Sequence, residues 1–354
     1  MSRNSTQQSP TLNGDDVGNF SRGAVSILLS LTVFAVAPAV VLADTPTAEL
    51  VLTWGSSGDQ PGEFHSPIGI AVNSKNEVFV TDLNNARVQR FSTDGKFISE
   101  FPLPRDTPDR KSTIVGGILI DADDLLYLSF MVQHKIEVYR ESGELVRTWG
   151  KKGTGREEFN QPGGMLLASD GNLLICDQCN HRIVKHTTLG RTVSEWGGYG
   201  LERGQFDGVA GQGSRFGGPH FLAKDSQERY YTTEGVQGRV QQFSKDGTWL
   251  SQWGSKGDQP GGFGNYKFGN LPHTFGPIGI VIDRHDRVFV SSLNDRVQCY
   301  DLSGKFLFAI QGTGRDQDTL MPLVHPHGMA FDRWGFLYLC DSGNQRILKF
   351  KLPD

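Results

Sequence analysis

The sequence LCDSGNQRI at residues 339–347 has a close copy, ICDQCNHRI, at residues 175–183. Both end in a basic residue followed by a β-branched one, and such a pair occurs six times, at spacings of 48, 47, 57, 57 and 50 residues. A period in this range is typical of a solenoid, a propeller or an array, so the content of one unit decides the fold. The six pairs are Arg87-Val88, Lys135-Ile136, Arg182-Ile183, Arg239-Val240, Arg296-Val297 and Arg346-Ile347.

Each unit contains four short apolar runs separated by polar turns. In the first unit, runs at residues 66–72, 77–80 and 87–91 precede Asp94-Gly95, where glycine tolerates the positive φ of a two-residue hairpin turn. The third run alternates apolar and polar residues, as a half-buried strand does. The fourth run often ends in Trp-Gly. Four antiparallel strands per unit, repeated six times, predict an all-β fold: a six-bladed β-propeller of four-stranded antiparallel blades.

The two ends of the repeat region indicate how the ring closes. Trp54 ends a strand at residues 48–54 that has no preceding strands of its own, and the last unit stops after three strands. We therefore expect residues 48–54 to complete the last blade as its outer strand, which closes the ring and hides a sheet edge. The predicted blades span about residues 62–101, 111–150, 159–197, 215–254, 275–310 and 322–352.

Residues 23–43 form an uncharged run that directly follows Arg22. Its densest apolar part and the small residues before Asp44 are typical of a secretory signal that is cleaved after Ala43. The run is also long enough for an uncleaved membrane anchor. Residues 1–43 are thus predicted to be a signal peptide or membrane anchor, and residues 44–354 the propeller. Either alternative places the propeller outside the cytoplasm, in the periplasm or secreted.

The charge balance narrows the range of partners. The chain has 354 residues, with 35 Lys and Arg against 39 Asp and Glu and a net charge of −4. Nucleic-acid binders need a dense basic surface to displace counterions, so we expect no nucleic-acid partner. Contact with a membrane is expected only through residues 23–43, if they are retained.

The units resemble NHL repeats. The likeness is closest at residues 339–347 and 176–183 and extends over about residues 48–352. It implies the six-bladed propeller fold. NHL propellers include enzymes, RNA binders, ubiquitin-ligase adaptors and extracytoplasmic sensors, so the resemblance does not choose among these functions.

Two histidines stand out where the inner strands of the blades begin, at one mouth of the central channel. His220 and His327 each follow a turn proline, whereas the other blades have small or apolar residues there. Histidine is a common metal ligand, and His325 and His273 lie nearby in sequence. The alternative is that His220 and His327 are channel-lining polar residues that bond to water or to the backbone.

The same two Pro-His pairs are similar to those of peptidyl-hydroxyglycine amidating lyases, which are also six-bladed and bind zinc through such histidines. The resemblance implies a zinc site that contains His220 and His327. The second blade has Gly116 where the third histidine of the lyases would stand, so His273 or His325 would have to supply the third ligand.

An acidic residue precedes the repeated basic one by five positions in four blades, as Asp82, Asp177, Glu234 and Asp341. These carboxylates could form a ring for calcium or another cation. We favour the alternative that each carboxylate braces its loop through charge-assisted hydrogen bonds to the basic residue.

Cys176 and Cys179 form a C-x-x-C motif. They are expected on the face of the ring where the loops between second and third strands and the links between blades open, which we call the loop face. Asn180 occupies the position after the second cysteine, where haem attachment requires histidine. The two thiols could form a disulfide in an oxidising compartment, or both could be free.

We therefore expect an exported NHL-type propeller that binds a protein, peptide or glycan through its loop face, with no cofactor. The alternative is a metal-dependent lyase or hydrolase with a histidine site at the channel mouth, for which zinc would be the metal; calcium would belong to the ring of carboxylates. An RNA-binding or ubiquitin-adaptor propeller is a third interpretation. The sequence identifies no catalytic residue.

Overall fold

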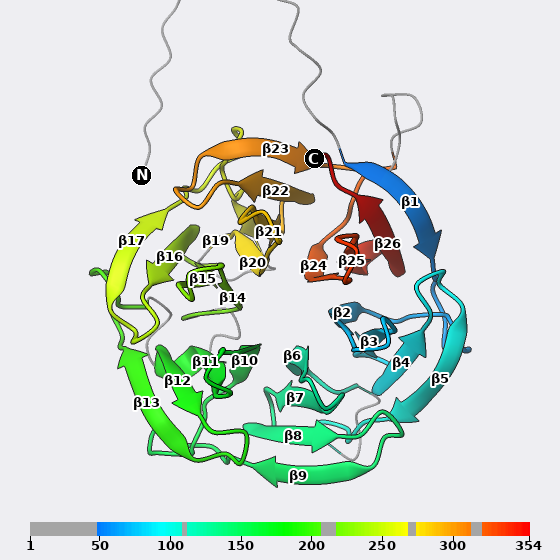
Figure 1. Ribbon diagram of the computed structural model, residues 1–354, viewed down its shortest axis with the longest axis horizontal. Coiled ribbons are helices and arrows are strands. Elements are labelled where there is room, and N and C mark those ends of the chain that lie inside the picture. Colours follow the sequence, from blue (N-terminus) through cyan, green and yellow to red (C-terminus); the bar gives the residue numbers. More distant parts are fainter. Residues whose placement is uncertain (1–47, 108–111, 207–216, 268–273, 313–320) are drawn as a thin grey trace, which may run out of the picture. The chain divides into compact units, whose positions relative to one another are not determined.

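The computed structural model describes residues 48–107, 112–206, 217–267, 274–312 and 321–354. These residues form a closed ring of six antiparallel four-stranded sheets around a central axis (Figure 1). No α-helix occurs among the residues described, which contain only two short 3₁₀ turns, η1 (Gln178–Asn180) and η2 (Ser342–Asn344). The predicted all-β six-bladed propeller is confirmed.

Each blade uses four strands, which run from the channel outward. Blade 1 contains β2 (Pro67–Val72), β3 (Val78–Asp82), β4 (Arg87–Phe91) and β5 (Phe97–Pro102). Blade 2 contains β6 (Val115–Ile120), β7 (Leu126–Phe130), β8 (Lys135–Tyr139) and β9 (Leu145–Trp149). Blade 3 contains β10 (Pro162–Leu167), β11 (Leu173–Asp177), β12 (Arg182–His186) and β13 (Thr192–Gly197). Blade 4 contains β14 (Leu222–Lys224), β15 (Tyr230–Glu234), β16 (Arg239–Phe243) and β17 (Trp249–Trp253). Blade 5 contains β20 (Pro277–Ile282), β21 (Val288–Ser292), β22 (Arg296–Tyr300) and β23 (Phe306–Ile310). Blade 6 contains β24 (Pro326–Phe331), β25 (Leu337–Asp341), β26 (Arg346–Lys351) and, as its outer strand, β1 (Glu49–Trp54).

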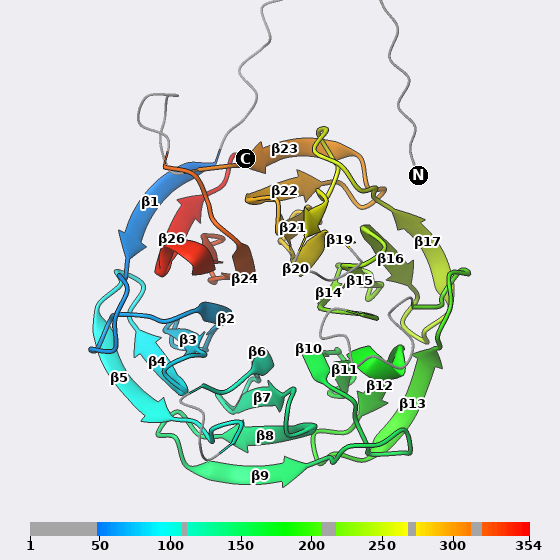
Figure 2. The ribbon, with the colours of Figure 1, turned by 180° about the vertical axis from the view of Figure 1, so that it is seen from behind.

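Strand β1 closes the ring as predicted. It pairs antiparallel with β26, with Leu50 opposite Phe350 and Trp54 opposite Ile347. Figure 2 shows β1 and β26 side by side from behind. The Trp54 ring packs 5.9 Å from Phe91 of blade 1, so the first strand also contacts the blade next to the one it completes.

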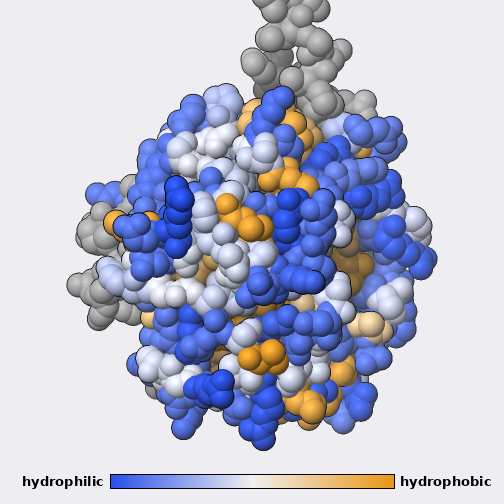
Figure 3. Space-filling model, turned by 60° about the vertical axis from the view of Figure 1, so that its left-hand side comes forward, coloured by the Kyte–Doolittle hydropathy of each residue, from blue (hydrophilic) through white to orange (hydrophobic). Residues whose placement is uncertain are grey.

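The core lies between the faces of adjacent blades. Every residue of the second strand in each blade is buried, because these strands have a neighbouring blade on both sides. The outer strands are partly exposed, and Figure 3 shows a largely hydrophilic side of the ring with separate, small hydrophobic patches. The fold therefore leaves no extended apolar surface on the side shown.

Side-chain hydroxyls on the second strand of one blade bond to the inner strand of the next blade. The hydroxyl of Ser129 donates to the Gly163 carbonyl at 2.7 Å, that of Thr233 to the Ile278 carbonyl at 2.6 Å, and that of Ser291 to the His327 carbonyl at 2.6 Å. Each bond satisfies a carbonyl on a channel-lining strand. These contacts position the inner strands, and with them the residues around the channel mouth.

The connection before blade 5 contains a small sheet of its own. It is a two-stranded hairpin, β18 (Tyr266–Lys267) and β19 (Thr274–Phe275), with Tyr266 opposite Phe275. Two residue pairs are too few to give a period-2 sequence pattern, so the hairpin leaves no clear signal in the sequence.

Candidate functional site at the channel mouth

The loop face of the ring contains a pocket of about 410 Å³ at the mouth of the channel. Its lining comes from the first residues of the inner strands and from the loops that join the second strand of a blade to the third. Apolar and polar side chains both face it, which suits a ligand that carries both kinds of group. The lining residues include Ile68, Asn84, Met131, Gln178, His220, Phe221, Ile278 and His327.

Glycines allow the inner strands to approach one another closely at this mouth. A Cβ at Gly116 would lie 2.5 Å from the Pro162 carbonyl oxygen, and one at Gly164 would lie 2.6 Å from Phe221 Cα. The Gly164 amide donates directly to the His220 carbonyl at 2.7 Å. Gly116 stands where the resemblance to the lyases would place a third zinc ligand, and these close contacts explain why this position has no side chain.

His327 is a half-buried residue of β24, and its ring bonds to the backbone just before that strand. Its Nδ1 lies 2.8 Å from the His325 carbonyl oxygen. Burial lowers the pKa of the His327 imidazole to about 4, although that hydrogen bond acts in the opposite direction. The ring is therefore neutral at physiological pH, and donation from Nδ1 to the carbonyl leaves Nε2 as an acceptor or ligand atom.

His220 is almost fully buried, with 3% of its surface exposed. Its amide donates to the Thr233 carbonyl at 2.9 Å, and its imidazole lies beside Gly235, where an added Cβ would be 3.0 Å from the ring. His220 and His327 both line the mouth pocket, as the sequence predicts. The two histidines come from alternate blades, with Ile278 of blade 5 between them in the order of the ring.

The two other candidate ligands do not complete a triad in the residues described. His325 packs edge-on against Tyr266, with ring centroids 4.8 Å apart, and does not line the pocket. His273 lies outside the described residues. Among the residues that the structure describes, no group of three or more His, Cys, Asp or Glu side chains could hold a metal ion.

Gln178 is a mouth residue that sequence reasoning missed. It begins η1 and is 4% exposed, and its Oε1 is buried with no hydrogen-bond partner. A buried acceptor without a partner costs free energy that a ligand donor could recover. Its position, directly after the repeated acidic residue, carries Leu83 and Met131 in blades 1 and 2, which also line the mouth. Variation at this position between otherwise similar copies is the signal that could have identified it.

The repeated carboxylates brace the loops, which confirms the interpretation favoured from the sequence. Asp82 and Arg87 form an ion pair at 2.9 Å, and Asp82 also accepts the His65 amide at 2.7 Å. The same ion pair recurs between Asp177 and Arg182, Glu234 and Arg239, and Asp341 and Arg346. Each carboxylate is thus bonded to protein donors.

Cys176 is a buried free thiol, so it forms no disulfide with Cys179. Burial raises the pKa of Cys179 to about 11 and that of Cys176 well above its usual range. A thiol at such a pKa is protonated at neutral pH and is a poor nucleophile. Cys176 occupies the position of Cys340 in the repeat, and both side chains pack between blades.

Comparison with known proteins agrees with this architecture. The NHL repeat model matches residues 64–91 and 159–185, which begin at the blade connectors and extend to the third strands of blades 1 and 3. The chain carries NHL repeats in a six-bladed propeller. This combination is consistent with a protein-interaction module.

Sequence relatives of the NHL propeller match it over short segments. Protein brain tumor of Drosophila melanogaster is 30% identical over 101 residues, which are 27% of this chain and 10% of that protein. Protein lin-41 of Caenorhabditis elegans is 46% identical over 50 residues, which are 14% of this chain and 4% of that protein. The match therefore spans about a tenth or less of the length of these relatives.

Solved structures share the propeller fold at low sequence identity. Virginiamycin B lyase from Staphylococcus aureus gives a TM-score of 0.54 at 18% identity, covering 87% of this chain and 100% of that chain. A protein of unknown function from Bacteroides thetaiotaomicron gives 0.63 at 16% identity, covering 87% and 76%. At these identities the likeness concerns the fold alone.

Within the part of the chain that the structure describes, no helix is both long and apolar enough to cross a membrane. The predicted signal or anchor at residues 23–43 lies outside that part.

Proposed function

We propose that this NHL propeller is an exported binding module that takes a protein or peptide segment in the mouth pocket of its loop face. The observation that carries the proposal is the pocket of about 410 Å³, whose lining combines apolar side chains with Gln178, a residue with a buried, unpartnered Oε1. A peptide offers both groups that this lining requires, because a backbone N–H can donate to Gln178 while a neighbouring side chain packs against Ile68 and Met131.

Two further observations support a protein partner outside the cytoplasm. Brain tumor and lin-41, which match this chain over short segments, contain the same kind of repeat. The uncharged run at residues 23–43 is typical of an export signal or anchor. A reporter fused after Ala43 tests export, and a reporter retained in the cytoplasm would contradict that part of the proposal.

A displayed peptide library tests the mouth. Peptides selected on the parent protein should lose at least about tenfold in affinity for Gln178→Ala, which removes the acceptor, and for Ile68→Glu, which places a carboxylate in the apolar part of the pocket; each loss corresponds to about 1.4 kcal/mol or more. Binding to Trp334→Ala, on the opposite face, should be unchanged. Isothermal titration calorimetry measures each affinity. Selected peptides that bind both mouth variants as tightly as the parent would contradict the proposal.

A metal-dependent lyase or hydrolase is the second candidate, because His220 and His327 line the same pocket and the virginiamycin B lyases share the fold. A zinc site would need a third protein ligand: either His273 supplies it, or His325 turns from its contact with Tyr266 toward the pocket. Purified full-length protein should then contain about one zinc ion per chain, and His220→Ala with His327→Ala should contain none, as measured by atomic emission. Zinc at background level in the parent would exclude a tightly bound zinc site; calcium is measured in the same samples.

A further inference from the structure

The face opposite the mouth contains a ring of contacts between blades. There, the turn between the first and second strands of a blade receives a side chain from the next blade. Asp124 accepts hydrogen bonds from the Ser74 amide at 2.8 Å and hydroxyl at 2.7 Å, and Asp286 accepts from the Ser226 amide at 2.9 Å and hydroxyl at 2.7 Å. Glu228 makes the same contact to Ser169, and Asn76 accepts the Arg333 amide at 3.2 Å. We call these four contacts turn latches.

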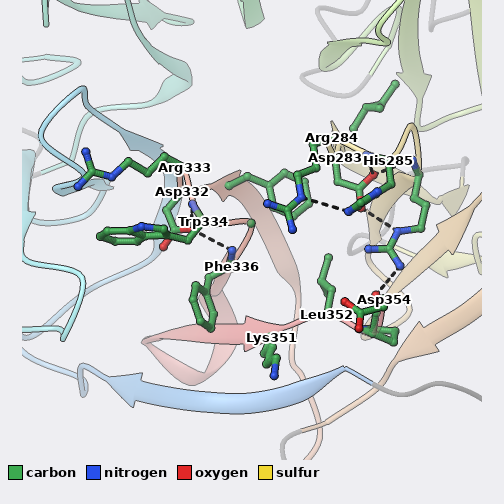
Figure 4. Close-up of a pocket in the computed structure, with 15 residues that line it drawn as sticks. Asp283, Arg284, His285, Asp332, Arg333, Trp334, Phe336, Lys351, Leu352 and Asp354 are labelled. Carbon is green, nitrogen blue, oxygen red and sulfur yellow. Dashed lines mark hydrogen bonds and ion pairs between the residues drawn. The ribbon is translucent and has the colours of Figure 1, made fainter.

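Two blade junctions have glycine at the latch position and therefore no latch. These residues are Gly171 in blade 3 and Gly335 in blade 6. At Gly335 a hollow of about 370 Å³ opens between the turns of blades 5 and 6, which we call the blade 5/6 hollow (Figure 4). An added Cβ on Gly335 would lie 3.6 Å from Arg284 Cζ, so Arg284 is next to the space that a latch side chain would fill.

Two of the three acidic side chains that line this hollow are already bonded within the protein, and the third, Asp354, is outnumbered by unpaired basic side chains. Asp283 accepts the Arg287 Nε at 2.7 Å and two backbone amides, and Asp332 accepts the Trp334 and Phe336 amides at 3.0 and 2.9 Å. In the described residues, Arg284 and Lys351 form no ion pair, and Arg284 bonds only to the neighbouring His285 ring. Figure 4 shows Arg284 between the two turns and Lys351 near the end of the chain.

The hollow also has features that suit a peptide. Arg287 Nη1 donates to the carbonyl oxygen of Pro353 at 2.6 Å, so a peptide carbonyl is already bound there. Ile282, Phe331 and Leu352 supply apolar surface. Trp334 is 52% exposed at the rim, with the Arg333 guanidinium 4.6 Å from its ring.

Size and charge favour a short segment over a long polyanion. About 370 Å³ accommodates a few residues, whereas a nucleic acid requires an extended basic surface, which a net charge of −4 does not favour. We propose that the blade 5/6 hollow docks a short acidic peptide segment, whose carboxylates pair with Arg284 and Lys351 and whose apolar side chain packs against Phe331. This site is independent of the mouth pocket.

Fluorescence anisotropy with a labelled eight-residue peptide of alternating Asp and Leu tests the site on the full chain. Binding should saturate and weaken with added salt, because exposed charges are screened. The double variant Arg284→Ala and Lys351→Ala should bind at least about tenfold more weakly. Arg140→Ala, which removes a positive charge elsewhere on the same face, should bind like the parent.

A second variant tests the hollow by its shape. Gly335→Asn places a latch side chain beside Arg284, and Asn tolerates the left-handed backbone that Gly335 adopts at φ +90°. It should reduce peptide binding at least about tenfold. Gly171→Asn is the matched control, because it fills the other unlatched position, where an added Cβ meets nothing within 4 Å, and should leave binding unchanged.

Three results would overturn the proposal. These are no saturable binding by the parent, undiminished binding by both the charge and the shape variants, or tighter binding of a sulfated oligosaccharide or an oligonucleotide of equal charge. The mouth variant Gln178→Ala should bind the acidic peptide like the parent, so failure at this site is distinguishable from failure of the proposed function.

Discussion

A protein that begins at Gly55 should show no cooperative thermal unfolding, whereas one that begins at Thr45 should unfold in a single transition. Removal of β1 uncovers the edge of β26 along its whole length. It also removes contacts from two core clusters: Leu50 packs against the core between blades 5 and 6, and Trp54 against the core between blades 6 and 1. Differential scanning calorimetry of the two proteins measures the effect.

Addition of a synthetic peptide of residues 45–54 distinguishes loss of the strand from general misfolding. If the ring fails only because its last blade is incomplete, the peptide should add to the edge of β26 and restore the transition. A protein that begins at Gly55 and melts within a few degrees of the longer one would contradict closure by β1.

Point variants on the same strand provide a matched pair. Trp54→Ala should destabilise the ring by about 3 kcal/mol, because it removes an aromatic side chain packed on Phe91 and Tyr338. Val51→Ala changes a side chain that is 49% exposed and should stay within about 0.5 kcal/mol of the parent. Urea unfolding gives both values.

The repeat made the fold predictable, because six similar units report the same strands and turns independently. The glycines also made the hairpin turns predictable, because such turns require a positive φ that glycine tolerates. Gly95 indeed has φ +76°. A second reason for glycine was not visible in the sequence. A Cβ at Gly95 would lie 3.1 Å from the Trp54 ring, and one at Gly247 would lie 2.6 Å from Trp196, so the tryptophan of one blade packs on the hairpin of the next. Such contacts join residues in different units, which the pattern of a single unit does not reveal.

The site was less predictable than the fold for a related reason. The repeat identified His220 and His327 because they depart from their neighbours in a shared alignment, and the structure places both at the mouth. Gln178 lies in a turn within a C-x-x-C motif, and that pattern points to the two cysteines rather than to the glutamine between them. The blade 5/6 hollow depends on Gly335 being compared with Asp286 and Asp124 at the equivalent turn position, and that equivalence is apparent only when the blades are superimposed.

Replacement of Asp177 by alanine should destabilise the fold by about 3 kcal/mol, because it leaves three hydrogen-bond donors of the loop brace without their acceptor. Asp177 is fully buried and accepts the Asn160 amide at 2.7 Å, the Asn180 side chain at 2.7 Å and Arg182 Nε at 2.9 Å. Without the carboxylate, these three donors lose their acceptor, while Arg182 keeps its ion pair with Glu195 and its bonds to carbonyls of the connecting loop. Glu144→Ala, which removes a carboxylate from an exposed ion pair with Arg140, is the control and should change stability by less than about 1 kcal/mol.

In blade 5 the repeated arginine has no acidic residue five positions before it, and an asparagine supplies the acceptor instead. Ser292 occupies the acidic position there and donates to the Phe263 carbonyl at 2.9 Å, and the side-chain oxygen of Asn294, oriented for hydrogen bonding, accepts Arg296 Nε at 2.8 Å. The arginine of blade 5 thus keeps an acceptor, which Asp177→Ala would not provide. Asp177→Asn retains one side-chain oxygen and should cost less than Asp177→Ala.

The pH dependence of the Asp177→Ala effect has a definite sign. Burial raises the pKa of Asp177 to about 6, above its ordinary value of 3.8, although the bonds from Asn160, Asn180 and Arg182 lower it. A carboxyl with a raised pKa in the folded state stabilises that state most when it is protonated, and this contribution is lost as pH rises through about 6. The difference in unfolding free energy between the parent and Asp177→Ala should therefore widen between pH 7.5 and pH 5, as measured by urea unfolding. A difference that narrows on acidification would show that the ionised form of Asp177 is the one the fold prefers.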